Sequence, residues 1–214
     1  MNLRRRNLML ALGLAPLGAF AQTRKYELGV DYSEISPTQP VETPGKIEVL
    51  EFFWYGCPHC YTLEPLLETW IARLPKDAQF RRVPAVFNEN WARDAAVFYA
   101  FEALGVLERL HRPYFDAIHR DRLNSRDQAT LNEWLRKNGV DVKKYEDAAK
   151  SFGVQSKVRR ASQLSAAYRI DGTPALAVHG RYTVSAEQGR THNGMLAIVD
   201  YLIGMVRKAG LAAK

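Results

Sequence analysis

The stretch "VLEFFWYGCPHCYTLEP", residues 49–65, joins an apolar run to two cysteines that lie three positions apart. The overlapping segment "KIEVLEFFW", residues 46–54, is too apolar to face water on either side, which predicts a buried strand inside a sheet. Residues 57–74 then have the apolar spacing of a helix, which Pro65 should kink. A strand therefore runs directly into a helix, and the cysteine pair lies where they join.

The two cysteines form a poor structural brace. Cys57 and Cys60 are the only cysteines of a 214-residue chain, which is long enough to bury a good-sized core without a brace. By the chain-entropy argument, a loop of about four residues contributes at most ~2 kcal/mol, against ~3 kcal/mol for a loop of about fifteen. Their position therefore indicates a chemical role.

The N-terminus of a helix favours a thiolate. Its free N–H groups and its dipole stabilise negative charge, so the pKa of Cys57 should lie well below the usual value of about 8.5. His59 can add a positive charge, and Pro58 suits the first helical position because it has no N–H to leave unpaired. Cys60 lies on the same side, within disulfide reach. Because a stabilised thiolate favours the reduced form, the Cys57–Cys60 disulfide is predicted to be a strong oxidant.

Two further features belong to the predicted site. The motif "GTPA", residues 172–175, begins a short strand, and if the Thr173–Pro174 bond is cis and faces Cys57, the backbone of Thr173 can pair with an extended substrate. Glu51 has two interpretations: an edge residue that reaches water, or a buried acid with a raised pKa. Its strand leads to the cysteines, which favours a proton-relay role toward Cys60.

The rest of the chain predicts a mixed sheet with a helical insertion. Residues 79–87 read as a second strand, and Pro84 indicates that this strand ends there or lies near an edge. Residues 89–168 show helix after helix, residues 173–184 read as two strands joined at His179–Gly180, and a final helix follows. The predicted class is therefore α/β.

One helix inside the insertion has both of its ends marked. Ser125 and Gln128 have the spacing of a capping box, and Gly139 can close the same helix. The apolar stripes of this region are expected to be core faces, not cofactor sites.

The N-terminus has the form of a cleavable export signal. Arg4, Arg5 and Arg6 precede an apolar run, and "AFA", residues 19–21, has the small-x-small form of a cleavage site ahead of Gln22. The alternative is a membrane anchor, but residues 8–21 fall short of the ~20 residues that a spanning helix needs. The mature protein is expected not to be embedded in a membrane and to work in an oxidising compartment.

The charge balance does not favour nucleic-acid binding. The net charge of +7 includes the three leader arginines, and without them 27 basic residues face 23 acidic ones, which leaves +4. The pairs Arg81–Arg82 and Arg159–Arg160 are expected to be solvated faces, because no aromatic residues are interleaved with them.

A metal carrier is the alternative from another functional class. Cys57, His59 and Cys60 could ligate zinc or copper, but a second cluster of ligands is missing. The remaining histidines are scattered singly and are each expected at the surface, so neither a metal nor another cofactor is predicted. They are His111, His119, His179 and His192.

Taken together, "VLEFFWYGCPHCYTLEP", the helical block and "GTPALAVHGRY" resemble the DsbA family of periplasmic thiol:disulfide oxidoreductases, over about residues 46–207. The resemblance implies a thioredoxin fold with an inserted all-helical domain. The implied division is a signal peptide at 1–21, a discontinuous thioredoxin-like domain at 22–88 and 162–214, and a helical domain at 89–161.

The resemblance also implies residue roles and partners. Cys57 is the exposed sulfur that substrates attack, Cys60 is its buried partner, and His59 stabilises the thiolate. Pro174 is the cis-proline and Glu51 the buried acid. Substrates would be unfolded exported proteins with free cysteines, and a DsbB-like quinone-linked membrane protein would reoxidise the pair.

One position departs from the family pattern. Thr173 precedes the cis-proline, where the best-known DsbA oxidases carry valine and isomerases often carry threonine, so a reductase or isomerase stays open as an alternative. Dimeric isomerases place a dimerisation domain ahead of the thioredoxin part. Only about 25 residues separate Gln22 from the first long strand, so a monomer is expected.

Overall fold

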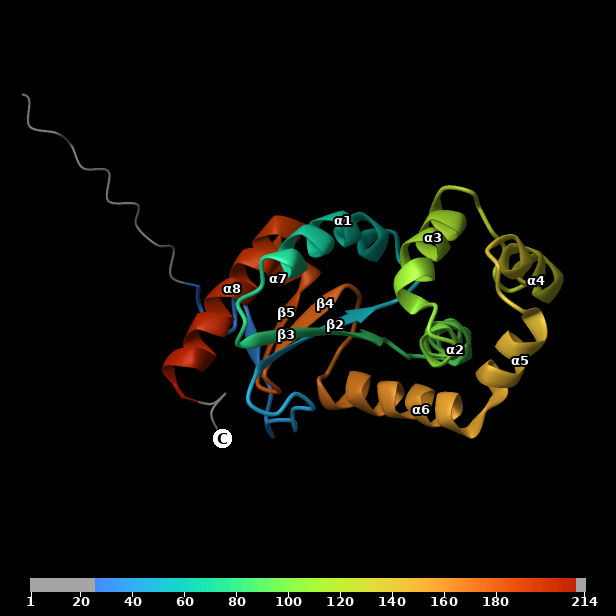
Figure 1. The fold of residues 1–214 in the computed structure, drawn as a ribbon. Coiled ribbons are helices and arrows are strands. Elements are labelled where there is room, and N and C mark those ends of the chain that lie inside the picture. The colour runs from blue at the N-terminus through green and yellow to red at the C-terminus, as the bar shows by residue number, and fades with distance from the viewer. Residues whose placement is uncertain (1–25, 211–214) are drawn as a thin grey trace, which may run out of the picture.

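The computed structural model describes residues 26–210, which are built on a five-stranded mixed sheet (Figure 1). Strand β2, Ile47–Phe53, runs parallel to β3, Ala78–Pro84, and antiparallel to β4, Ala175–Val178. Strands β5, Tyr182–Ser185, and β1, Ser33–Glu34, complete the order β1-β5-β4-β2-β3. Every residue of β2 is buried, so the prediction of an interior strand is confirmed.

Two sequence signals at strand ends are also confirmed. Strand β3 is an edge strand and stops at Pro84, which has no N–H to donate to a further partner. Strands β4 and β5 are joined through His179 and Gly180, whose φ angles of 53° and 67° are those that a tight hairpin turn requires.

Helices cover both faces of the sheet. Strand β2 sends Ile47 and Val49 into a core shared with α1 and α8, while Leu50 and Phe52 point the other way and pack beside Ala161 of α6. Figure 1 shows α1 and α8 on one side of the sheet and α6 on the other. Among the described residues the helices are α1 (Pro58–Ala72), α2 (Glu89–Ala103), α3 (Leu107–His119), α4 (Gln128–Lys137), α5 (Val142–Lys150), α6 (Phe152–Ala167), α7 (Ala186–Gly189) and α8 (His192–Lys208).

Helices α2 to α6 follow one another between β3 and β4; α2 to α5 form a lobe beside the sheet, and α6 runs from this lobe along one face of the sheet (Figure 1). The core of this helical block is aromatic, with Phe101, Tyr114 and Phe115 among its buried residues. Phe53, the last residue of β2, reaches into the same core, as do both cysteines. The cysteine pair therefore lies where the sheet meets the inserted block.

Helix α4 begins differently from its prediction. Its N-cap is Asp127, whose carboxylate accepts hydrogen bonds from the N–H of Thr130 at 2.8 Å and from its hydroxyl at 2.6 Å. The predicted capping box of Ser125 and Gln128 is wrong, because Asp127 stands directly before the helix and offers an ionised acceptor that suits the helix dipole. Gly139 follows the end of the helix with a φ of 69°, as predicted.

Across residues 26–210, no helix is both long enough and apolar enough to cross a bilayer. Helix α8 spans 17 residues, and its apolar residues, among them Val199 and Leu202, pack into the core above the sheet. The predicted export signal, residues 1–21, lies outside the described residues.

Candidate active site

The N-terminus of α1 presents the cysteine pair. Cys57 is the N-cap of this helix and Pro58 its first residue. The backbone N–H of Cys57 donates to the carbonyl of Trp54 at 2.9 Å, which turns the chain from β2 into the helix. One helical turn brings the N–H of Cys60 to 3.5 Å from the Cys57 Sγ. Both cysteines are free thiols in this structure, so it represents the reduced pair.

The surroundings of Cys57 stabilise its thiolate. A hydrogen bond from the Cys60 thiol makes the largest contribution, and the Thr173 side chain and the backbone N–H groups of Cys60 and His59 add to it. Cys57 is only 6% exposed, so the expectation of an exposed sulfur is wrong: the first turn of α1 and the Thr173 loop cover it. The hydrogen bonds outweigh this burial and lower the pKa of Cys57 to about 5. Cys57 is therefore a thiolate at neutral pH, as its place at the helix N-terminus predicts.

Cys60 has the opposite environment. Its side chain is fully buried, and burial raises the pKa of its thiol well above the usual value. The hydrogen bond to Cys57 and the negative charges of Cys57 and Glu51 raise that pKa further. The pKa values of two thiols one helical turn apart are thus displaced in opposite directions. At neutral pH, Cys60 therefore holds a proton when the pair is reduced.

The loop before β4 closes the site from the side opposite α1. The Thr173–Pro174 peptide bond is cis, and the Cys57 Sγ lies 3.3 Å from the Thr173 carbonyl oxygen. A cavity of about 830 Å³ begins at this loop and extends along β1 and β5.

Glu51 is a buried acid, not an edge residue. Its side chain is fully buried on β2, and its only ion pair among the described residues is with Arg82 of β3, at 3.3 Å. Burial, followed by the negative charge of Glu64, raises the pKa of Glu51 to about 8, although Arg82 opposes this. Glu51 is therefore protonated at neutral pH and lies behind Cys60, whose pKa it affects.

Comparisons with known proteins place this site in a family. A family described as the DSBA-like thioredoxin domain matches residues 72–193. The thiol:disulfide interchange protein DsbA of Bordetella parapertussis is 43% identical to this chain over 204 residues, which cover 94% of this chain and 96% of that protein. The chain belongs to the DsbA family.

Solved DsbA structures have the same fold. The crystal structure of Pseudomonas aeruginosa DsbA matches with a TM-score of 0.82 and 36% identity, over 86% of this chain and 96% of that one. The oxidoreductase NmDsbA3 of Neisseria meningitidis matches with a TM-score of 0.73 and 30% identity, over 86% and 98%. The predicted thioredoxin fold with a helical insertion is confirmed, and this DsbA family member is a thiol:disulfide oxidoreductase with the cysteine pair Cys57–Cys60.

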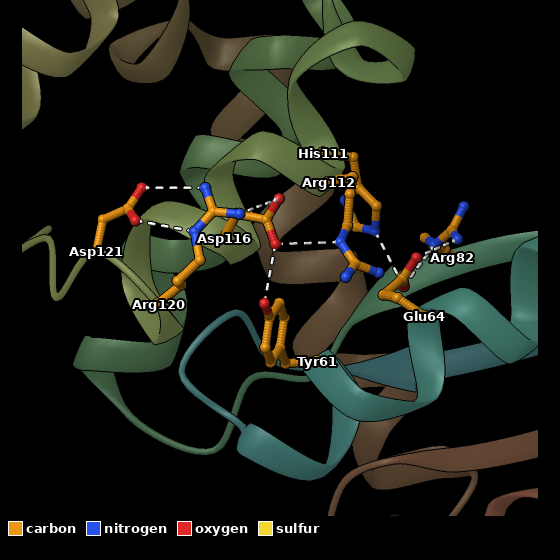
Figure 2. Close-up of polar contacts among 8 residues, drawn as sticks. All are labelled: Tyr61, Glu64, Arg82, His111, Arg112, Asp116, Arg120 and Asp121. Atoms are coloured by element: carbon orange, nitrogen blue, oxygen red, sulfur yellow. Dashed lines mark hydrogen bonds and ion pairs between the residues drawn. The ribbon is translucent and has the colours of Figure 1, made fainter.

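Behind the cysteines, this DsbA family member carries a second group of charged side chains that sequence reasoning missed. Figure 2 shows Glu64 of α1 between Arg82 of β3 and His111 of α3. Arg82 donates to Glu64 through Nη2 at 2.8 Å and Nε at 3.3 Å, and the His111 Nε2 lies 3.2 Å from the Glu64 Oε1. Glu64 is fully buried, and this group links the sheet, the active-site helix and the inserted block.

Two surface expectations are wrong at this group. His111 is only 6% exposed, because it lies on the inner face of α3 with Tyr114 and Phe115, three and four positions later. Arg82 does not belong to a solvated basic face either, since its ion pairs with Glu51 and Glu64 hold it against the interior. The register of the sheet pairs Glu51 with Arg82, and this register was the signal that sequence alone did not supply.

His59 lies on the outer side of α1 and is exposed. Its backbone N–H contributes to lowering the pKa of Cys57, and the role of its imidazole stays a prediction. Within the part of the chain that the structure describes, no three His, Cys, Asp or Glu side chains are placed to hold a metal ion.

Proposed function

We propose that this protein oxidises the cysteines of exported proteins by donating its Cys57–Cys60 disulfide. The observation that carries this direction is the opposite displacement of the two thiol pKa values, to about 5 for Cys57 and well above the usual value for Cys60. A stabilised Cys57 thiolate favours the reduced pair, so the disulfide readily accepts electrons from a substrate.

In the first step a substrate thiolate attacks the Cys57 sulfur of the disulfide. A bond forms between the substrate sulfur and Cys57, the Cys57–Cys60 bond breaks, and Cys60 leaves with the electron pair. Because burial raises the pKa of Cys60, this thiolate takes up a proton. We assign Glu51 as the donor, since burial raises its pKa and it lies beside Cys60.

In the second step another thiolate of the same substrate attacks the substrate sulfur that is bonded to Cys57. The substrate disulfide forms, the bond to Cys57 breaks, and Cys57 leaves as a thiolate. Its pKa of about 5 makes it a good leaving group. The substrate loses two electrons, the cysteine pair gains them, and Glu51 recovers its proton from solvent.

The other predicted residues support these steps. Thr173, whose carbonyl oxygen lies 3.3 Å from the Cys57 Sγ, and Pro174 would hold the extended substrate chain next to Cys57. Pro58 opens α1 without an unpaired N–H, and the backbone N–H of His59 helps to stabilise the thiolate.

The setting of the reaction follows from the export signal and from the family. The protein would be exported to the periplasm by residues 1–21, act as a monomer on unfolded proteins, and be reoxidised by a DsbB-like quinone-linked membrane protein. The DsbA family membership supports substrate proteins of this kind. A reductase or isomerase is the alternative, because Thr173 precedes the cis-proline.

The reduction potential of the pair separates these functions. We would equilibrate the protein with glutathione buffers at about pH 7, alkylate the free thiols and measure the oxidised fraction by mass spectrometry. An oxidase should give a potential well above that of glutathione. From about pH 5 to 7 the potential should fall by about 30 mV per pH unit, because only Cys60 then takes up a proton with the two electrons. A potential near that of thioredoxin would overturn the proposal.

A further inference from the structure

Two buried carboxylates behind the cysteines compete for one cation. Glu51 and Glu64 are both fully buried, and both form ion pairs with Arg82. Arg82 gives Glu64 two N–H donors, whereas neither carboxyl oxygen of Glu51 has a hydrogen-bond partner among the described residues. Because one guanidinium cannot balance two carboxylates away from water, one of the two acids must hold a proton.

His111 adds a third donor to Glu64. Its Nε2 lies 3.2 Å from the Glu64 Oε1, and its Nδ1 lies 2.9 Å from the Tyr55 hydroxyl. An ionised carboxylate can only accept, so Nε2 carries the hydrogen. In the neutral ring Nδ1 is then an acceptor, and the Tyr55 hydroxyl donates to it. The two contacts therefore select one tautomer of His111.

The imidazole ring is also held in place. The rings of Phe53, Phe98 and Phe115 stand edge-on to it, with centroids 5.3, 6.0 and 5.2 Å away. Burial lowers the pKa of His111, although Glu64 opposes this, so the ring is neutral at pH 7 and donates a hydrogen bond without adding a charge. The ionisable and charged groups that act on the ring are Tyr55 from the loop after β2, Glu64 from α1, Arg82 from β3 and Glu108 from α3.

We propose that His111 is a positioning residue that decides which of the two buried carboxylates keeps the shared proton. By donating to Glu64 it keeps Glu64 ionised, and Glu51 then remains the protonated acid beside Cys60. The proposal rests on the function proposed above, since the transfer to Cys60 needs this proton. His111 belongs to α3, so the inserted helical block contributes directly to the cysteine chemistry.

The acidities of the two carboxyls agree with this arrangement. Burial opposes the ionisation of Glu64, but the hydrogen bond from His111 and the contacts with Arg82 outweigh burial, and the pKa of Glu64 lies below its usual value. The pKa of Glu51, which has no comparable donors, lies near 8. The asymmetry between the two acids therefore follows from where the N–H donors are.

The test is a pH titration of the carboxyl groups by NMR, on reduced full-length protein carrying 13C-labelled glutamate, with the two signals assigned through E51Q and E64Q. H111F keeps an aromatic ring in the cage but removes the donor. It should raise the pKa of Glu64 by about one unit or more, because one hydrogen bond to a charged group is lost. H111Q keeps an N–H near the position of Nε2 and should restore the low pKa.

His119 provides the matched control. It also lies on α3 and also contacts Tyr55, through its Nε2 at 2.8 Å from the Tyr55 carbonyl oxygen, but none of its hydrogen bonds is to Glu64. H119F should leave the titration of Glu64 unchanged. An unchanged Glu64 in folded H111F, or an equal shift in H119F, would overturn the proposal.

The tautomer of His111 can also be measured without any variant. If H111F does not fold, the 15N signals of His111 in the unmodified protein decide, since the proposal requires the Nε2–H tautomer at about pH 7 and the other tautomer would contradict it. The titration needs no substrate, so it reports on His111 whatever the direction of electron flow. A potential near that of thioredoxin would overturn the oxidase function and leave the NMR result as it stands.

Discussion

The two sides of the cysteine pair differ more than their sequence separation suggests. On the outer side, Cys57 meets hydrogen-bond donors from the first turn of α1 and from Thr173, and its pKa falls to about 5. On the inner side, Cys60 is buried among apolar side chains, and its pKa rises. One residue type in one helical turn thus takes two chemical roles, because a thiolate is stabilised only where donors reach it.

Removing either sulfur gives the largest expected effect. C57S should lose all detectable oxidation of a reduced test protein, because no sulfur remains for the substrate to attack. C60S has no disulfide to donate, but its Cys57 thiolate can attack a disulfide of an oxidised substrate, which frees one substrate thiolate; the resulting mixed disulfide should accumulate, since no Cys60 thiol remains to displace it. Turnover assays and mass spectrometry of the adducts measure both outcomes. Continued oxidation by both variants would contradict the exchange mechanism.

Replacing the acid behind Cys60 tests the inner side alone. E51Q should slow the release of Cys60 on the order of a hundredfold at about pH 7, the low end of what a positioned general acid contributes. The rate of the unmodified protein should fall as the pH rises through the raised pKa of Glu51, where this acid loses its proton, and E51Q should lack this step. Stopped-flow measurements with a reduced peptide record both.

Glu48 offers a control on the same strand. It is also buried on β2 and pairs with Arg81 at 3.1 Å, but it points to the opposite face of the sheet. E48Q should therefore keep the rate and the pH profile of the unmodified protein. If E51Q and E48Q behave alike, Glu51 is not the proton donor.

E51Q should also change the free energy of unfolding, in a direction that the pKa of Glu51 determines. The folded pKa of Glu51 is about 8, above the value of about 4.3 in an unfolded chain. Between these values the native protein holds a proton that the unfolded chain has released, so the free energy of unfolding falls as pH rises. E51Q lacks this loss and should be more stable at about pH 8, by roughly 5 kcal/mol. Urea unfolding at about pH 5 and 8 should show a gap that widens with pH; a constant gap would contradict the assignment.

A change far from the pair should have the smallest effect. Ser151 caps α6 at an exposed corner of the helical block, where its hydroxyl accepts from the N–H of Val154 at 3.2 Å. S151A should lower the free energy of unfolding by about 1 kcal/mol. The pH dependence of Cys57 alkylation should not move. A displaced Cys57 pKa would show that the outer side depends on the whole block and not on the helix turn and Thr173.

The elements that sequence predicted correctly depend on near neighbours in the chain. The buried strand β2 follows from an unbroken apolar run, and the hairpin turn from His179 and Gly180 between two short strands. The start of α4 was wrong because Asp127 and Ser125 compete as caps within three residues, and spacing alone does not rank them.

Sequence by itself determined that a cysteine pair stands at a helix N-terminus after a buried strand, and with it the redox chemistry. It did not determine which groups surround the two thiols and the acid behind them, since several of these groups come from distant parts of the chain. Arg82 arrives through the register of β3 with β2, His111 through the inner face of α3, and Thr173 through the loop before β4. Burial and charge act through space, so only the tertiary structure decided which groups meet behind Cys60 and which meet at Cys57.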